Sequence, residues 1–229
     1  MKKIIHLNHL SYSIPYGASI LEKLDLEVHE GEFLGILGHN GAGKTTLIDI
    51  LMGFRKASSG VVEIFGEDPH AIARAYRKDV SFLSQDVTLK ASISIRSYLE
   101  FHSGFFPNYS RMLEAHLLKR FSLDPDAKIG SLSTGQQKKV QVVAGLASLP
   151  KLILIDEITA VMDPETRKIF FEEIESFRKN HPCAVILATN IAEDLIDRCD
   201  NILFVKDKQG VLHSPSEIGL VFNLGQVAA

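Results

Sequence analysis

The feature that most constrains the fold of this chain is the glycine-rich run GHNGAGKTT at residues 38–46. It fits the Gly-x-x-x-x-Gly-Lys-Thr pattern of phosphate-binding loops in full. A short apolar run at 32–37 precedes it, and Leu47, Ile50 and Leu51 follow at helical spacing. Because the pattern is meaningful only where a strand runs into the loop and a helix begins at its end, the context agrees with the motif.

The loop predicts how the phosphates of a nucleotide are held. Gly41 and Gly43 let backbone N–H groups turn toward the phosphates, and the helix that begins near Lys44 adds about half a positive charge at its amino end. Lys44 is expected to reach the β- and γ-phosphates, and the Thr45 hydroxyl to bind Mg²⁺. The residues predicted to contact the phosphates are Gly38, His39, Asn40, Gly41, Ala42, Gly43, Lys44, Thr45 and Thr46. The alternative, a glycine-rich turn with a chance lysine, is disfavoured by the strand and helix around it.

Two acids close the apolar run LILIDE at 152–157. A carboxylate at the carboxyl end of a buried parallel strand points into the crevice where α/β proteins bind ligands. Asp156 is therefore predicted to hold the Mg²⁺ shell through water, and Glu157 to polarise a water for in-line attack on the γ-phosphate. The alternative interpretation is a solvated acidic turn.

The rest of the chain alternates strands and helices. Residues 184–188 form another continuous apolar run of strand length, and Phe170, Ile174 and Phe177 mark the buried stripe of a crossover helix before it. This alternation predicts an α/β fold with a parallel sheet. Residues from about 90 to 130 are interpreted as a helical insert.

Composition and charge exclude several classes of protein. A net charge of −3 gives no electrostatic reason to expect nucleic acid as a partner. Cys183 and Cys199 form no C-x-x-C pair and are interpreted as reduced structural thiols. No apolar run of about 18 residues occurs, and none of signal-peptide length follows the opening lysines, so we expect no membrane-spanning segment.

The run LSTGQQ at 132–137 contains a second helix start that is suited to binding an anion. Ser133 is a good N-cap, and Gly135 leaves the backbone uncrowded, so the following helix would present N–H groups to an anion. Taken alone, this run is a well-capped helix. Its functional interpretation depends on the other motifs, because the chain has only one glycine loop to cradle a nucleotide.

The order and spacing of these motifs resemble those of the nucleotide-binding subunits of ABC transporters over nearly the whole chain. In that family LSGGQ precedes a strand with two terminal acids, as LSTGQ precedes LILIDE here. The resemblance implies an α/β P-loop NTPase fold of the ABC-ATPase type, with a mixed core sheet, an N-terminal antiparallel β subdomain and a helical subdomain. It implies one ATPase domain over 1–229, with the core and β subdomain at about 1–89 and 140–229 and the helical subdomain at 90–139.

The resemblance also implies that a second ATPase subunit completes each ATP site. Ser133 and Gly135 would cap the γ-phosphate of ATP held by the loop of the second subunit, so that two ATP molecules lie in a head-to-tail dimer. The residues of this signature implied to contact ATP are Ser133, Thr134, Gly135 and Gln136. The second subunit can be an identical chain or a homologous one.

Further residues of this chain occupy positions that have known roles in the family, as judged from the order of the motifs. Gln85 resembles the glutamine that contacts Mg²⁺ and senses the membrane partner, although a glutamine that ends a strand is more often a surface amide. Asp163 resembles the acid of the loop that crosses the dimer seam. An aromatic side chain is expected to stack on adenine, and Tyr16 is chosen over Tyr12. The implied Mg²⁺ ligands are Thr45, Gln85 and Asp156, and the implied catalytic residues are Glu157, Lys44, Gln85 and Asn190.

The chain departs from the family pattern at three places. Thr134 stands where the family usually has glycine. Ile158 and residues 160–162 also differ from the residues that are commoner in the family at these positions. Asn190 occupies the position of the family's switch histidine. Asparagine can donate an N–H to a γ-phosphate oxygen, but it cannot carry a positive charge or shuttle a proton. We therefore expect ATP binding and dimer closure to persist while turnover is slow.

The resemblance implies a cytoplasmic protein on the inner face of the cell membrane, bound to an integral-membrane transporter subunit. The contact is expected between Gln85 and about Phe106. The short segment between Gln85 and Ser133 favours bacterial exporters over importers. Three alternatives differ from this sequence pattern. DNA-associated ATPases carry a long coiled-coil insertion, translation-associated ones carry two nucleotide domains, and a P-loop small-molecule kinase would need no LSTGQ segment.

Overall fold

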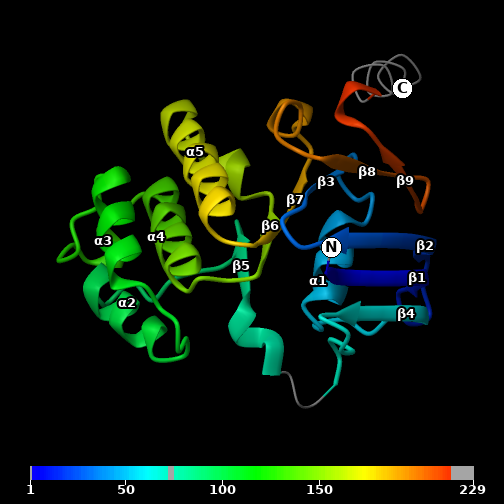
Figure 1. Cartoon of the computed structure of the whole chain (residues 1–229), viewed down its shortest axis with the longest axis horizontal. Helices are drawn as coiled ribbons and strands as arrows, with labels where there is room; N and C mark the ends of the chain where they lie inside the picture. The colour runs from blue at the N-terminus through cyan, green and yellow to red at the C-terminus, as the bar shows by residue number, and fades with distance from the viewer. Residues whose placement is uncertain (1, 72–74, 218–229) are drawn as a thin grey trace. The chain divides into compact units, whose positions relative to one another are not determined.

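The computed structural model describes residues 2–71 and 75–217. The chain divides into two compact units, one formed by residues 1–76 and 184–229 and the other by residues 77–183. We call the first the loop unit, because it contains the glycine loop, and the second the helical unit, because it contains α2 to α5 (Figure 1). The domain boundaries at 89/90 and 139/140 stay a prediction.

The loop unit contains an antiparallel three-stranded sheet. Its strands are β1 (Lys3–Ser13), β2 (Ser19–His29) and β4 (Ser59–Ile64), in the order β2-β1-β4. Leu24, Leu26 and Val28 alternate with exposed residues and bury one face of β2. The predicted N-terminal antiparallel sheet is therefore confirmed.

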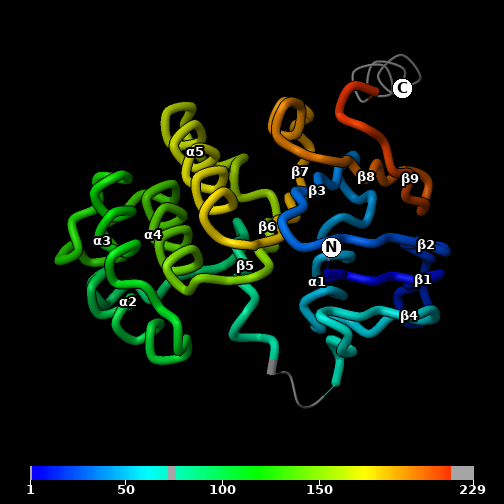
Figure 2. The backbone as a smooth tube through the Cα atoms, viewed as in Figure 1, coloured from blue at the N-terminus to red at the C-terminus, as the bar shows by residue number. Residues whose placement is uncertain are grey.

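A second sheet of the loop unit mixes strand directions. The strands β3 (Phe33–Leu37), β7 (Ala184–Thr189), β8 (Asn201–Lys206) and β9 (Gln209–His213) follow the order β7-β3-β8-β9. β3 runs parallel to both of its neighbours, and β9 runs antiparallel to β8; Figure 2 shows the trace of these strands. Every residue of β3 and β7 is buried, as the continuous apolar runs predict. The mixed core sheet is confirmed.

The helix α1 (Lys44–Leu51) begins where the glycine loop ends. It stops before Gly53, whose φ of +70° lies in the left-handed region. A Cβ at this position would lie 2.0 Å from the Pro69 carbonyl oxygen, so only glycine fits. Glycine is therefore required where the chain leaves this helix.

The helical unit places two parallel strands beside its helices. β5 (Val80–Ser84) pairs with β6 (Leu152–Asp156) in a register that sets Ser84 opposite Asp156. The helices are α2 (Ile95–Ser103), α3 (Arg111–Arg120), α4 (Thr134–Ala147) and α5 (Pro164–Asn180). In α5 the predicted stripe of Phe170, Ile174 and Phe177 is buried.

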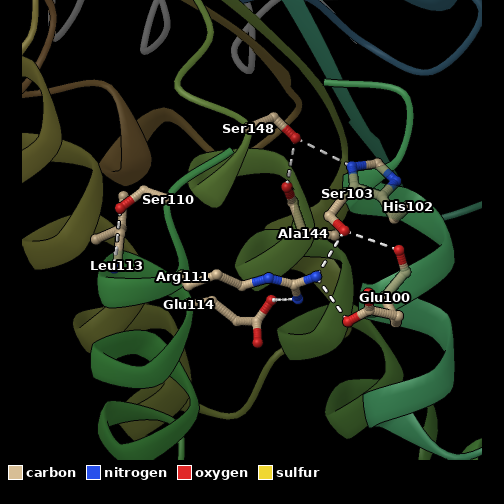
Figure 3. A network of polar contacts seen from close by, with 9 residues as sticks. All are labelled: Glu100, His102, Ser103, Ser110, Arg111, Leu113, Glu114, Ala144 and Ser148. Carbon is tan, nitrogen blue, oxygen red and sulfur yellow. Dashed lines mark hydrogen bonds and ion pairs between the residues drawn. The ribbon is translucent and has the colours of Figure 1, made fainter. Parts of the chain in front are cut away.

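Polar contacts join α2, α3 and α4 within the helical unit (Figure 3). Ser148 donates its hydroxyl hydrogen to the Ala144 carbonyl at 2.8 Å and lies 3.1 Å from His102 Nε2. Because that hydrogen is committed to Ala144, His102 Nε2 is the donor to Ser148 Oγ. The Arg111 guanidinium binds three side chains, those of Glu100, Ser103 and Glu114. Among the described residues, no helix has both the length and the apolar character needed to cross a membrane.

Candidate functional site

The glycine loop connects β3 to α1 in a conformation that requires glycine. Gly41 has φ +81° and Gly43 has φ +105°, both in the left-handed region. A Cβ at Gly43 would lie 3.0 Å from Ile20 Cγ2 and 3.1 Å from Leu21 Cδ2. Gly43 is therefore required twice, once by its backbone conformation and once by its packing against the start of β2.

Lys44 is held inside this loop. Its side chain is only 4% exposed, and its ammonium donates to the carbonyl oxygens of Gly38 at 2.9 Å and His39 at 3.1 Å. These hydrogen bonds keep the positively charged ammonium inside the loop, where its charge attracts phosphate oxygens. The helix start adds to the attraction, because α1 has no side-chain cap and no acid in its first turn. The loop can bind a polyphosphate.

Asn190 lies beside the glycine loop in the loop unit. β7 pairs with β3 so that Thr189 is opposite Leu37, and both strands therefore end at the same edge. Asn190 Nδ2 donates to Asn40 Oδ1 at 3.1 Å. The residue at the switch position is thus in direct contact with the loop that would carry the phosphates.

The two candidate adenine-stacking residues differ in their surroundings. The Tyr12 side chain is packed, with 7% exposure, and its hydroxyl accepts from Arg55 Nη1 at 3.2 Å. The Arg55 guanidinium also lies 5.9 Å from the centre of the Tyr12 ring. Tyr16 is fully exposed, in the turn that leads into Ile20. These surroundings favour Tyr16 as the residue with an accessible ring.

In the helical unit, Gln85 and the two acids come together at the ends of β5 and β6. The Gln85 N–H donates to the Asp156 carbonyl oxygen at 3.2 Å, and Gln85 Nε2 lies 3.4 Å from Glu157 Oε2. Asp156 is 4% exposed and Glu157 is half-buried. The parallel register of β5 and β6, in which Ser84 lies opposite Asp156, produces this juxtaposition.

Glu157 has an unusual backbone conformation. Its φ of 51° and ψ of 17° place a non-glycine residue in the left-handed region, at the start of the 3₁₀ turn Ile158–Val161. Such residues cost on the order of 1–3 kcal/mol and cluster at functional sites. The residue predicted to be the general base therefore has a backbone conformation that no local sequence pattern indicated.

The LSTGQ run forms the amino end of α4. Ser133 Oγ accepts from the Gln136 N–H at 3.2 Å, and Gln136 Oε1 accepts from the Ser133 N–H at 2.9 Å, which completes a capping box. This box leaves the N–H groups of Thr134 and Gly135 as the donors that the helix itself does not use. A Cβ at Gly135 would meet Val161 O at an ordinary 3.5 Å, so glycine is not required by packing within this unit.

Asp163 caps α5. Its two carboxylate oxygens accept from the Thr166 N–H at 2.8 Å and from the Thr166 hydroxyl at 2.7 Å. These hydrogen bonds lower the pKa of the Asp163 carboxyl. Within the chain, Asp163 therefore has a structural role, and its predicted role at a dimer seam stays a prediction.

The donor set implied for Mg²⁺ suits that ion chemically. Thr45, Gln85 and Asp156 offer hydroxyl, amide and carboxylate oxygens, which are the hard ligands that Mg²⁺ prefers. In the part of the chain that the structure describes, no group of three or more His, Cys, Asp or Glu side chains is placed to hold a metal. Mg²⁺ bound by one carboxylate together with phosphates does not need such a group.

Two contacts in these regions were missed by sequence analysis. Asn40 was assigned only to the phosphates, yet it also contacts Asn190. The carbonyl of Val87, just after Gln85, accepts hydrogen bonds from Lys138 and Gln141 of α4. A lysine and a glutamine three positions apart beside the buried valines of α4 are the signal that could have indicated the second contact.

A glycine loop that seats a lysine between strand and helix, together with an acid pair at the end of a parallel strand, defines a P-loop nucleotide-binding protein. The family model described as ABC transporter matches residues 21–160. Because this segment is more than half of the chain, the protein belongs to the ABC transporter family, as an ATP-binding component. The family resemblance and the ABC-ATPase fold class are thereby confirmed.

Three similar proteins illustrate the relationship. A Nod factor export ATP-binding protein I from Burkholderia orbicola is 29% identical over 87% of this chain and 69% of its own length. An arabinose import ATP-binding protein, AraG, from Rhizobium meliloti is 25% identical over 96% of this chain and 45% of its own length. The solved structure of cbiO1 from Clostridium perfringens, described as part of the ABC transporter complex cbiONQ, superposes with a TM-score of 0.79 at 25% identity, covering 98% of this chain and 93% of that one. The chain spans between 30% and 69% of the length of the first curated relatives.

Proposed function

We propose that this chain is the ATP-hydrolysing subunit of a bacterial ABC exporter that works with a separate integral-membrane subunit. The observation that carries the proposal is the loop in which Gly41 and Gly43 are left-handed and the buried Lys44 ammonium is held by the carbonyls of Gly38 and His39, because this geometry suits a triphosphate. Export is supported by the similarity to the Nod factor export protein, at 29% identity, and by the short segment between Gln85 and Ser133.

The residues divide the work of hydrolysis as follows. Lys44 binds the β- and γ-phosphates, and Tyr16 stacks on adenine. Mg²⁺, when bound through Thr45, Gln85 and Asp156, neutralises charge on the phosphates. Glu157 accepts the proton of the attacking water, with Gln85 holding its carboxylate in orientation. Asn190, on Asn40 of the loop, donates an N–H to the γ-phosphate.

We further propose that ATP drives two chains into a head-to-tail dimer. The capping box of Ser133 and Gln136 fixes the start of α4, and the N–H groups of Thr134 and Gly135 are aimed at an anion there. In the dimer these donors, with Ser133, cap the γ-phosphate of ATP held by the second chain, while Asp163 lies at the seam. Closure of this dimer does the mechanical work of transport.

The membrane partner is proposed to bind the helical unit on the cytoplasmic side of the membrane. A cavity of about 90 Å³ opens there, lined in part by Val87, Tyr98, His102, Phe106, Gln141 and Ser148. Beside it, Phe101 and Phe105 pack edge to face with ring centroids 5.1 Å apart, yet they are 67% and 63% exposed. An exposed apolar pair of this kind is typical of an interaction surface. It supports the predicted contact between Gln85 and about Phe106.

The hydrolytic role is tested by replacing Glu157 with glutamine. Loss of the general base should lower steady-state ATP hydrolysis by roughly 10²–10⁴-fold while ATP binding persists. Glu165→Gln, an exposed acid in the first turn of α5, is the matched control and should keep normal turnover. Gel filtration with ATP should show Glu157→Gln as a dimer. A monomer that transfers phosphate to a small molecule would instead identify a kinase.

The slow turnover expected from Asn190 has its own test. Asn190→His restores a side chain that can carry a proton, so ATP hydrolysis in the assembled complex should rise above that of the native chain. Equal or lower hydrolysis by the histidine variant would remove Asn190 as the cause of slow turnover.

A further inference from the structure

The backbone carbonyl of Val87 is held by two side chains of α4. Lys138 Nζ donates to it at 2.9 Å and Gln141 Nε2 at 2.8 Å. The two donors are three positions apart and therefore lie on one face of the helix. We call this group of Val87, Lys138 and Gln141 the Val87 clamp.

The clamp uses groups that are costly to bury. Lys138 is 3% exposed and Gln141 is 4% exposed. Burial lowers the pKa of the Lys138 ammonium, and the nearby Asp86 carboxylate offsets only part of this effect. Apolar side chains would fill this space at a lower desolvation cost, so packing does not explain a lysine here. What the ammonium provides is a strong, directed hydrogen bond to one carbonyl.

Val87 itself has little else to fix it. Its side chain is 36% exposed, so burial does not anchor it. The segment 85–87 is held at one end by Gln85, through the Asp156 carbonyl and the 3.4 Å contact with Glu157, and at the other end by the clamp. Between these two points the Asp86 N–H donates to Ser84 Oγ at 3.2 Å. Two side chains of α4 therefore fix the backbone two residues beyond the amide that contacts Glu157.

We propose that Lys138 and Gln141 are positioning residues for hydrolysis, which act through Val87 and Gln85 to orient the Glu157 carboxylate. They do not touch the nucleotide. Because both lie on α4, the helix that Ser133 caps, the clamp links the helix start proposed to cap ATP with the carboxylate proposed to activate water. The inference rests on the proposed ATP hydrolysis and adds these residues to it.

The test compares turnover and ATP affinity in the full-length chain. Lys138→Met keeps the length of the side chain and removes its donor, so kcat should fall on the order of tenfold to a hundredfold, as expected for a displaced catalytic group. The KM for ATP should stay within about twofold, because the phosphate loop belongs to the other unit. Lys138→Arg, which keeps a charged donor, should restore most of kcat. Lys119→Met, an exposed lysine of α3, is the control.

A double variant separates positioning from a general structural defect. If the clamp acts through Glu157, adding Lys138→Met to Glu157→Gln should lower kcat no further than Glu157→Gln alone. A further drop of the same factor would overturn the inference, as would native kcat in Lys138→Met. Gln141→Met, of nearly equal shape, gives the same comparison if Lys138→Met does not fold.

The proposed hydrolysis and the clamp can fail separately. If the native chain hydrolyses no ATP, or if Glu157→Gln keeps its turnover, the proposed function fails. The clamp is then tested by hydrogen exchange. The exchange rate of the amides at 85–88 should rise in Lys138→Met and not in Lys119→Met. Unchanged exchange in Lys138→Met would refute the clamp on its own.

Discussion

Replacing Gly43 with alanine tests the glycine loop most sharply, because two independent costs meet at this position. An L-residue in the left-handed region costs about 1–2 kcal/mol. The φ of +105° at Gly43 lies beyond the centre of that region, so the upper end of this range applies. The added methyl group would also stand 3.0 Å from Ile20 Cγ2 and 3.1 Å from Leu21 Cδ2, which must move by a few tenths of an ångström. We expect a total loss of about 2–3 kcal/mol.

Two other glycines give matched controls. Gly31 and Gly41 both have φ +81°, and a Cβ at either would meet nothing within 4 Å. Alanine at these positions should therefore cost only the conformational term, about 1–2 kcal/mol. Gly41 belongs to the phosphate loop and Gly31 does not, so only the Gly41 variant of this pair should also weaken ATP binding.

The assays are urea and thermal unfolding of the native chain and the three variants, with binding of a fluorescent ATP analogue measured in parallel. Gly43→Ala should be the least stable, and its melting temperature should fall by about 4–12 °C, at 2–4 °C for each kcal/mol. A Gly43→Ala variant as stable as the native chain would refute the strained geometry. Equal ATP affinity in Gly31→Ala and Gly41→Ala would refute the assignment of the loop.

Three further predictions concern the interior. Burial lowers the pKa of His102 below its ordinary 6.5. Just below pH 6.5 the unfolded state therefore binds more protons than the folded state, and stability should fall as the pH falls. His102→Gln should flatten this part of the stability profile, measured by thermal unfolding. Burial raises the pKa of the Cys183 thiol to about 12, so alkylation of the native protein at mildly alkaline pH should be slow, and rapid modification would contradict this packing. Phe170→Ala should cost about 3–5 kcal/mol in urea unfolding, because Phe170 is fully buried in α5; a loss below about 1 kcal/mol would contradict that burial.

The elements that sequence analysis located best are the ones with continuous apolar runs. β6 at 152–156 and β7 at 184–189 lie on the two predicted runs, because a strand buried on both faces needs apolar residues throughout. β9 was missed, since its residues are half-exposed or exposed and show neither a run nor clean alternation. Helix α4 begins at Thr134, directly after Ser133, which the sequence predicts as its N-cap.

The parts of the site that could be predicted are those in which a local sequence motif specifies the local backbone geometry. Gly43, Lys44 and the acids after β6 follow from local patterns, and the structure adds the contacts that hold them. The left-handed Glu157, the Asn190–Asn40 contact and the Val87 clamp depend on the tertiary position of residues with ordinary local patterns. Neither propensity nor spacing could have specified them.

The central claim is that each ATP site takes its loop from one chain and its capping helix from another. Mixing two inactive variants tests it directly. Lys44→Ala lacks the loop lysine and Ser133→Arg blocks the capping helix, so each alone should be inactive. In an equal mixture, half of the dimers are mixed and each has one intact site of two, so about a quarter of native ATPase activity should return. A mixture as inactive as its parents, or full hydrolysis by a strictly monomeric native chain, would contradict the account.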